Sequence, residues 1–364
     1  MRAVAVVGLL YLFLVGIKGL EAGIQAFGSN VVEGLFDAVT NPVAGLFAGV
    51  LGTALVQSSS LTTAMIVGLV GSGVLPLESA VPMIMGANIG TSVTNGFVSM
   101  GHVRRGQEFR RAFAGATVHD CFNILTVIVA LPLELATGFL EKTATALTEL
   151  LGRQDVVAGT SSKGFIQPIL SWPISRITDL LGERSSVVAG FALLALGVAL
   201  VFIALTLITR TMRTLLAGGI ERSLNRLLER GAGIGGMAVG VVVTMLVQSS
   251  SITTSILVPM MAAGILTLPN AFPVTLGANV GTTITALLAS VAVPDAAALT
   301  IALVHSLFNV FGILLFYPVP AMRRIPIGLA QTLGDIAERR KVWALIWVAG
   351  VFFVIPLIGL MVLR

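Results

Sequence analysis

Two stretches of this sequence carry the same polar residues at the same spacing. Gln57–Ser60 reads QSSS and is followed by Gly86–Thr91, which reads GANIGT; Gln248–Ser251 reads QSSS and is followed by Gly277–Thr282, which reads GANVGT. The 47-residue segments around these motifs align without a gap at an offset of 191 residues, and 22 of the 47 pairs are identical. An old duplication with no present role would scatter the polar identities. The repeat therefore predicts one site to which both halves contribute.

The QSSS motif offers groups for an anion and for a cation. We predict that each motif forms the tip between two short helices. The free N–H groups and the dipole at the start of the second helix attract an anion, and serine hydroxyls add donors. The last carbonyls of the first helix, with Gln and Ser oxygens, are acceptors for a hard cation. In the Gly-Ala-Asn motifs, Gly and Asn allow the chain to leave the helix, so that Thr91 and Thr282 can start a second half-helix.

Neither repeated motif contains Lys or Arg. An anion buried there needs a counter-charge, because uncompensated charge inside a membrane is costly. Small cations held by oxygen ligands can supply it, so the motifs predict cation-coupled anion transport. Ser and Thr can also simply hold membrane helices together. Two matched tips, each followed 31 residues after its Gln by Asn88 or Asn279, favour a site over that structural role.

The elements that must position these motifs are membrane helices. The chain of 364 residues is 56% hydrophobic and 11% charged, whereas soluble domains carry about 25% charged residues. This composition excludes a soluble enzyme, a nucleic-acid-binding protein and a disordered scaffold. Stretches of about 20 apolar residues can cross a bilayer, and these are Ala3–Phe27, Leu77–Met100, Ala112–Leu140, Val187–Thr209, Leu268–Val293, Ala296–Pro318 and Val342–Leu363. Shorter apolar segments are Pro42–Val56, Leu61–Val74, Met237–Val247 and Ile252–Leu266.

Clusters of basic residues predict how the chain is oriented. Most of the Lys and Arg residues lie in the connections 104–111, 210–230 and 323–341, and such connections favour the cytoplasmic side. All three are cytoplasmic only if the two QSSS segments dip into the membrane and return, one from each side. Each half then has three crossings and one re-entrant hairpin. Because three is odd, the two halves are inverted relative to each other.

We therefore predict an all-α polytopic membrane protein with two inverted-topology repeats, each with a re-entrant helical hairpin tipped by QSSS and a discontinuous helix. Interrupted segments in matching positions of two halves are typical of transporters that work by alternating access. The segments Asn30–Thr40 and Arg210–Arg230 are amphipathic and predict interfacial helices. The predicted units are a first repeat (1–140), an extracellular or periplasmic linker (141–185), a second, inverted repeat (186–320), and a cytoplasmic connector with a final transmembrane helix (321–364).

A second group of polar residues lies outside the repeated motifs. His119, Asp120 and Asn123 share one face of a helix at spacings of three and four. His305 and the Asn four residues after it repeat the His–Asn spacing, but Ser306 replaces the carboxylate. We predict a structural His–Asn pair in both halves. Asp120 breaks the symmetry, and an ionisable residue inside a membrane helix is a functional candidate by default.

The sequence does not predict an enzyme. It contains Ser, His and Asp, but it has no G-x-S-x-G elbow. His119 and Asp120 are adjacent on a helix and cannot face one substrate together. No Cys/His cluster suggests zinc and no Walker-type loop suggests ATP. We therefore expect no catalytic residues and no cofactor.

The paired motifs resemble those of the type II sodium-dependent phosphate cotransporters. Phe109–Asn123, which reads FRRAFAGATVHDCFN, is also similar to that family. The resemblance covers roughly residues 40–130 and 230–315. It implies sodium-coupled import of inorganic phosphate across a lipid bilayer, with sodium as the coupling ion; a sodium symporter for another small oxyanion is the alternative. The short 141–185 segment and the single cysteine, Cys121, fit a bacterial member, so we expect a multi-pass protein of the bacterial inner membrane.

The resemblance also implies roles for particular residues. In that family the second QSSS and the Thr-rich stretch after the second Gly-x-Asn help to form a sodium site, but Ala278 stands here where the family has Ser. Asp120 matches an Asp found in the electrogenic members. His102 and Arg105 stand where family members have Gln and Asp, which is a departure from the pattern.

Together these arguments give two sets of candidate residues. The predicted phosphate-binding residues are Gln57, Ser58, Ser59, Ser60, Thr91, Ser249, Ser250 and Ser251. The predicted sodium ligands are Gln248, Ser249, Asn279, Thr282, Thr285, Asn88, Asp120 and Asn123.

Overall fold

A computed structural model of the protein describes residues 2–26, 41–157, 162–181, 186–230, 233–293 and 295–363. Within these ranges the regular elements are all helices and none is a β-strand, so the predicted all-α class is confirmed. The amphipathic segment Asn30–Thr40 lies outside the described residues. The one at Arg210–Arg230 forms the end of helix α10.

Six helical stretches in the described part of the chain are long and apolar enough to cross a membrane, and they match six of the seven predicted spans. The seventh, Leu77–Met100, is divided into two shorter helices. They lie in α1 (Arg2–Gln25), α7 (Gly106–Thr137), α10 (Ser186–Arg230), α13 (Leu268–Ala292), α14 (Ala296–Phe316) and the C-terminal helix formed by α16 (Val342–Ala349), η1 (Gly350–Val354) and α17 (Ile355–Val362). The shorter apolar helices are α3 (Pro42–Val56), α4 (Ser59–Gly71), α11 (Gly233–Val247) and α12 (Ser250–Ala262). The chain is thus a multi-pass membrane protein.

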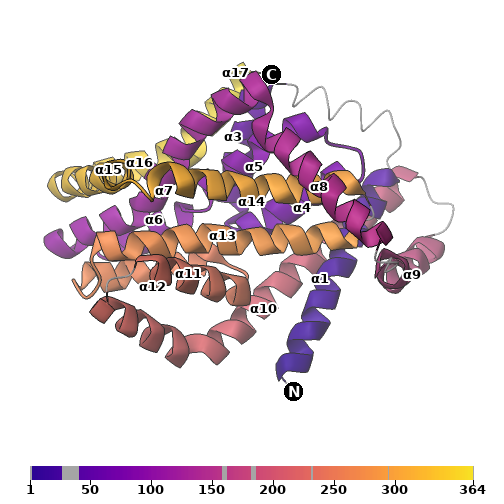
Figure 1. Cartoon of the computed structure of the whole chain (residues 1–364), viewed down its shortest axis with the longest axis horizontal. Helices are drawn as coiled ribbons and strands as arrows, with labels where there is room; N and C mark the ends of the chain where they lie inside the picture. The colour runs from indigo at the N-terminus through magenta and orange to yellow at the C-terminus, as the bar shows by residue number, and fades with distance from the viewer. Residues whose placement is uncertain are drawn as a thin grey trace.

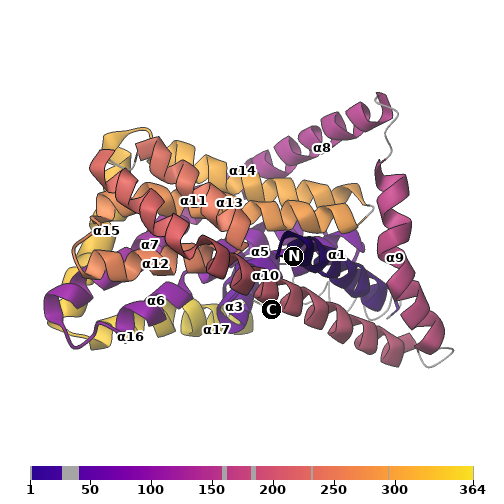
Figure 2. The same ribbon diagram turned by 90° about the horizontal axis from the view of Figure 1, so that it is seen from below.

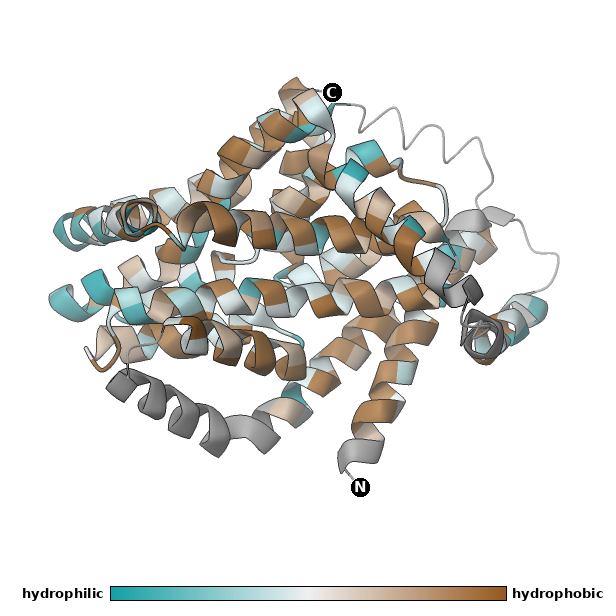
Figure 3. Ribbon diagram, viewed as in Figure 1, coloured by the Kyte–Doolittle hydropathy of each residue, from teal (hydrophilic) through white to brown (hydrophobic). Residues whose placement is uncertain are grey.

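The long helices α13 and α14 run along the length of the molecule, and α7 crosses them obliquely (Figure 1). Figure 3 shows hydrophilic residues at one end of this bundle, around α15 (Pro320–Arg339) and the start of α7, and at the opposite end on α9 (Ser162–Leu181). Apolar residues dominate between the two ends. At the α15 end, Arg110 forms an ion pair with Asp335. The apolar band between polar ends is the arrangement that a bilayer requires.

The segment predicted as a linker at 141–185 is mostly helical. α8 (Phe139–Val157) follows α7 after Gly138, and α9 lies at the edge of the molecule (Figure 2). Glu134 near the end of α7 accepts hydrogen bonds from the backbone N–H groups of Leu140 (2.7 Å) and Glu141 (3.1 Å). The start of α8 is thereby attached to α7, because Glu134 satisfies N–H groups that have no partner within their own helix.

The two repeated segments pack in the same way. α3 crosses α5 (Leu77–Gly90) so closely that a Cβ on Gly86 would lie 2.0 Å from the carbonyl oxygen of Leu46. α11 crosses α13 equally closely, and a Cβ on Gly277 would lie 1.9 Å from the carbonyl oxygen of Met237. Each pair is related to the other by the same offset of 191 residues. The repeated glycines are therefore required for the backbones to touch.

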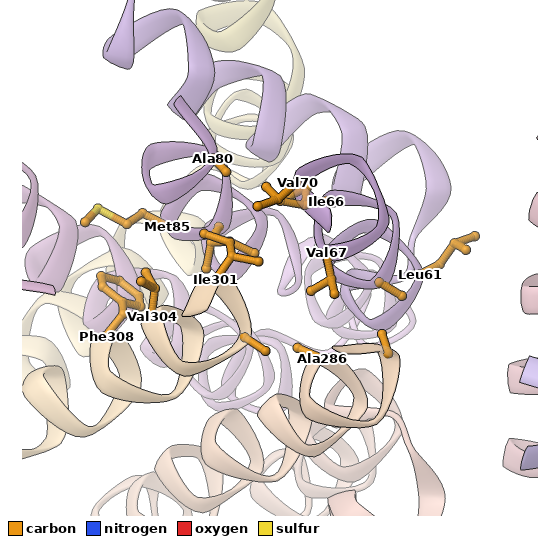
Figure 4. Packing of buried hydrophobic residues seen from close by; sticks show 14 of the residues in the cluster. Leu61, Ile66, Val67, Val70, Ala80, Met85, Ala286, Ile301, Val304 and Phe308 are labelled. Carbon is orange, nitrogen blue, oxygen red and sulfur yellow. The ribbon is translucent and has the colours of Figure 1, made fainter. Parts of the chain in front are cut away.

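The largest hydrophobic core cluster includes residues from both halves. Figure 4 shows side chains of α4 and α5 from the first half against those of α13 and α14 from the second. Packing of apolar side chains across this boundary joins the halves into one body. The labelled residues are Leu61, Ile66, Val67, Val70, Ala80, Met85, Ala286, Ile301, Val304 and Phe308.

Only one of the two helices predicted to be discontinuous is interrupted. In the first half a turn at Thr91-Ser92 separates α5 from α6 (Val93–Met100). In the second half α13 runs without a break, so the predicted interruption at Thr282 is wrong. The residues after each motif differ in helix propensity: Asn95-Gly96 are poor helix formers, whereas Ala286-Leu287 at the matching positions are strong ones and favour a continuous helix in the second half.

Candidate substrate and ion site

Both QSSS motifs form tips with the same backbone geometry. Gln57 (φ 54°) and Gln248 (φ 56°) are the only non-glycine residues of the described chain with positive φ. Ser58 and Ser249 follow in extended conformation and accept hydrogen bonds from backbone N–H groups in the next turn, at 3.2 and 3.4 Å. A Gln in the left-handed backbone region carries a steric cost, and residues with such strain occur most often at functional sites. Each motif therefore ends one helix and caps the next, as predicted.

A cavity of about 330 Å³ lies between the two tips, at the lower end of the range for small-ligand sites, roughly 300–1,000 Å³. The first tip lines it with Gln57 and Ser58, and the second with Gln248 and Ser249. The third wall is one face of α10, where residues recur at helical spacing: Phe202, Leu205, Thr206, Thr209 and Arg210. The two motifs, 191 residues apart in sequence, thus meet at one cavity.

Two serine hydroxyls bond across the boundary between the halves. Ser60 donates to the carbonyl oxygen of Gln248 at 3.0 Å, and Ser251 donates to the carbonyl oxygen of Thr91 at 3.2 Å. The remaining predicted serines, Ser59 and Ser250, are buried at the first turns of α4 and α12. The third serine of each motif therefore links the tips, while the first faces the cavity.

The residues predicted to hold sodium in the second half lie together in part. Thr285 donates its hydroxyl to Oε1 of Gln248 at 2.7 Å, and Nε2 of Gln248 donates to the carbonyl oxygen of Met245 at 2.6 Å. Thr282 donates to the carbonyl oxygen of Ala278 at 3.0 Å. Gln248 and Thr285 are thus joined directly, and Ser249 is the neighbour of Gln248 at the cavity.

The three predicted asparagine ligands form a separate buried network. Nδ2 of Asn279 donates to Oδ1 of Asn123 at 2.8 Å, and Nδ2 of Asn123 donates to the carbonyl oxygen of Asn88 at 2.8 Å. Nε2 of His119 hydrogen-bonds Oδ1 of Asn279, and Nε2 of His305 hydrogen-bonds Oδ1 of Asn88 at 3.3 Å. Each histidine therefore pairs with the motif asparagine of the opposite half. A structural role was predicted for the His–Asn pair of each half; within the second half, Nδ2 of Asn309 donates to the backbone carbonyl oxygen of His305 at 3.0 Å.

The side-chain hydrogen bond of Asp120 does not involve either tip. It is buried in the middle of α7, and its Oδ2 accepts a hydrogen bond from the indole Nε1 of Trp347 at 2.9 Å. Its other oxygen has no hydrogen-bond partner among the described residues. The structure thus places the predicted site residues in three groups: the tips, the Asn–His network and Asp120.

Sequence reasoning missed two residues of this region. The QSSS motifs lack a basic residue, but α10 brings Arg210 to the cavity, which corrects the expectation of a site without positive charge. Thr206, Thr209 and Arg210 lie close together at the end of the apolar stretch Val188–Met212 of α10, a signal that the sequence contains. Asn95 is the second: it donates to Thr254 (2.9 Å) and accepts from Ser255 (2.9 Å).

Comparison with known proteins identifies the family. The model of the Na+/Pi-cotransporter family matches residues 12–140 and 200–330. The chain belongs to this family. The match includes both tips and α13, which form the geometry described above. The family is one of transporters, in agreement with the prediction that the chain is not an enzyme.

Relatives of this chain are named as sodium-dependent phosphate transport proteins. The chain is 35% identical to sodium-dependent phosphate transport protein 2A of Ovis aries over 95% of its own length and 65% of that protein. It is 33% identical to sodium-dependent phosphate transport protein 2B of Homo sapiens over 98% of its length and 64% of that protein. The chain thus spans just under two thirds of the length of these relatives. No solved structure matches the chain.

Proposed function

We propose that the chain imports inorganic phosphate together with sodium by alternating access. The observation that carries this proposal is the meeting of both QSSS tips at one cavity. Family membership and the names of the 2A and 2B relatives support phosphate and sodium as the substrates. No catalytic residue and no cofactor are needed, because the protein moves its substrates without changing them.

Phosphate binds at the cavity, held by donors from both tips. The candidate groups are the amide of Gln57, the hydroxyls of Ser58 and Ser249, and the backbone N–H groups at the starts of α4 and α12. Arg210 adds a positive charge on the third wall. The remaining predicted phosphate residues support the tips: Ser59, Ser60, Thr91, Ser250 and Ser251.

Sodium binds to neutral oxygens beside the second tip and to Asp120. Gln248, Ser249, Thr282 and Thr285 supply side-chain and backbone oxygens of the hard type that sodium prefers. Asp120 supplies the carboxylate. Asn88, Asn123 and Asn279, the other predicted sodium ligands, form the buried hydrogen-bond network that joins the two halves.

The chain is divided as the sequence suggests, into repeats at 1–140 and 186–320 with 141–185 between them and 321–364 after them. α3–α4 and α11–α12 are re-entrant hairpins, and the repeats are inverted in the membrane. Matched glycine packing in the two segments supports two equivalent units. The basic ends of α7 and α15, joined by the Arg110–Asp335 ion pair, support one cytoplasmic face. The single, buried Cys121 and the short 141–185 segment favour a bacterial inner membrane.

The test is uptake of radiolabelled phosphate by proteoliposomes that contain the purified protein. An inward sodium gradient should drive accumulation, and an equal potassium gradient should not. Equal uptake in both media would contradict sodium coupling. Excess unlabelled sulfate distinguishes phosphate from another oxyanion: strong competition would favour the alternative substrate class.

A further inference from the structure

The C-terminal helix reaches the buried carboxylate of Asp120. Nε1 of Trp347 in α16 donates to Oδ2 of Asp120 in α7 at 2.9 Å, across a sequence separation of 227 residues. Residue 347 lies beyond the segments that the family model matches, which end at 330. The hydrogen bond therefore ties a candidate ion residue to a helix outside the repeated segments.

The other oxygen of the carboxylate is left without a protein partner. Asp120 is 3% exposed, and its Oδ1 accepts no hydrogen bond from the described residues. The Ser92 hydroxyl lies next to the carboxylate, but it donates to the carbonyl oxygen of Ile89 at 3.0 Å. A buried carboxylate oxygen without a donor is costly. A small cation at Oδ1 removes that cost, and hydroxyl and carbonyl oxygens at the α5–α6 break can complete its ligands.

The chemistry of the surroundings favours a hard monovalent cation. Within the described residues no group of three His, Cys, Asp or Glu side chains is placed to hold a metal ion. A transition metal prefers nitrogen or sulfur ligands, and a divalent cation is usually held by several carboxylates. One carboxylate with neutral oxygens matches the single charge of sodium.

The C-terminal helix that carries the indole packs against the first half at two places. Val348 packs against Gly96 of α6, where a Cβ on the glycine would lie 2.9 Å from the valine side chain. Further along the helix, Gly359 packs against Phe47 of α3. Figure 2 shows α16 beside α6 and α17 near α3. Between these contacts lies the π-helical turn η1, and Pro356 just after it cannot donate a backbone hydrogen bond. Wide turns of this kind are frequent at functional sites.

We propose that Trp347 is a positioning residue for sodium coupling: its indole N–H fixes Oδ2 of Asp120, which leaves Oδ1 directed at the cation. The inference rests on the proposed function, since Trp347 would act in the same transport cycle. The second half has no matching carboxylate, because Ser306 stands at the position equivalent to Asp120. The indole thus controls only the cation that the first half binds.

Replacement of Trp347 by Phe tests the positioning role. Trp347→Phe keeps an aromatic ring but removes the donor. We expect the sodium concentration for half-maximal uptake to rise about tenfold, since hydrogen bonds to charged groups are among the stronger ones. The phosphate KM at saturating sodium should stay within about twofold. Trp343→Phe, one turn earlier and exposed, is the matched control and should behave as wild type.

A double-mutant cycle shows whether the indole acts through the carboxylate. In an Asp120→Gly background, Trp347→Phe should have no further effect on the sodium dependence. Equal additional effects in both backgrounds would overturn the proposal, because the indole would then act elsewhere.

Fluorescence of Trp347 itself gives a readout that does not depend on the Trp347→Phe variant folding. The chain has three tryptophans, so the double variant Trp172→Phe, Trp343→Phe leaves Trp347 as the only one. Sodium should shift its emission and potassium should not, and Asp120→Gly should abolish the shift. No sodium shift in the single-tryptophan protein would contradict the proposal.

Different results would contradict the proposed function and the role of Trp347. If wild-type uptake does not depend on sodium, the proposed function is wrong. If wild-type uptake is sodium-dependent but Trp347→Phe matches Trp343→Phe, only the role of Trp347 is wrong.

Discussion

The two tips have the same four residues and the same backbone, yet their side chains are paired differently. The side chain of Gln248 is bonded to Thr285 and the residue is 7% exposed, whereas Gln57 is exposed and its side chain has no hydrogen-bond partner among the described residues. At the position that matches Thr285, the hydroxyl of Thr94 is buried without a partner. The sequence of a tip therefore determines its backbone, while its side-chain pairing depends on the surrounding helices.

A second pair of threonines shows the same difference. Thr244 donates to Thr253 at 2.8 Å, but Thr53 at the matching position in the first half has a buried hydroxyl without a partner. The second tip is thus the more fully bonded of the two. In the alternating-access cycle proposed above, the two units must differ in any one state, because the site opens to one side at a time. We interpret the unequal pairing as this difference.

The largest effect is expected from removal of either tip glutamine. Gln57→Ala and Gln248→Ala should each reduce phosphate uptake to background, since both side chains line the same cavity. Both variants should reach the membrane in normal amounts and elute as folded protein. Wild-type uptake by Gln57→Ala would show that the exposed tip is dispensable and that the two tips are not equivalent in function.

The charge on the third wall should matter less, because Arg210 is exposed and partly screened by solvent. Arg210→Gln should raise the phosphate KM about tenfold, with a smaller change for Arg210→Lys. Arg324→Gln on α15, away from the cavity, serves as the control. An unchanged phosphate KM in initial-rate uptake would remove Arg210 from the site and restore the view that cations alone balance the anion.

The matched threonines Thr285 and Thr94 test directly whether the two tips differ in side-chain hydrogen bonding. Thr285→Val removes a hydroxyl that is bonded and should destabilise the protein by about 1 kcal/mol. Thr94→Val removes a buried hydroxyl that has no partner, so its stability in the same state should be unchanged or slightly higher. Thermal unfolding in detergent measures both. Equal destabilisation by the two variants would mean that the tips are bonded alike.

The smallest effect concerns an acidic cluster that only the first half has. Burial, together with the nearby carboxylates of Glu78 and Glu134, raises the pKa of Glu141 above its usual value; Pro269 stands where the second half would have the match of Glu78. A raised pKa in the folded state means that stability falls as pH rises from the normal glutamate range through the raised value. Glu141→Gln should therefore raise the melting temperature slightly at pH 7 and not at pH 4.

The control for this variant is Glu149→Gln, on the exposed face of the same helix. An identical pH dependence for the two variants would show that the cluster does not perturb Glu141.

Local pattern was sufficient for much of the fold. Hydropathy located the six spans, and the QSSS motifs located both helix ends, because these depend on residues close in sequence. The continuous α13 was missed because the prediction relied on the match between the two Gly-Ala-Asn motifs. The strong helix formers Ala286-Leu287 after the second motif favour a continuous helix there. Three features depend on contacts between distant segments and could not be read locally: the crossed His–Asn pairs, Arg210 at the cavity and the bond from Trp347 to Asp120.

The most direct test of the account is equilibrium binding of radiolabelled phosphate to the purified protein in sodium and in potassium at equal ionic strength. The tips offer an anion neutral donors, and α10 adds one exposed Arg, so full binding requires a co-bound cation. We predict that phosphate binds at least tenfold more tightly in sodium than in potassium, and that Gln248→Ala removes this difference. Equal affinities in the two salts for the wild-type protein would contradict the account.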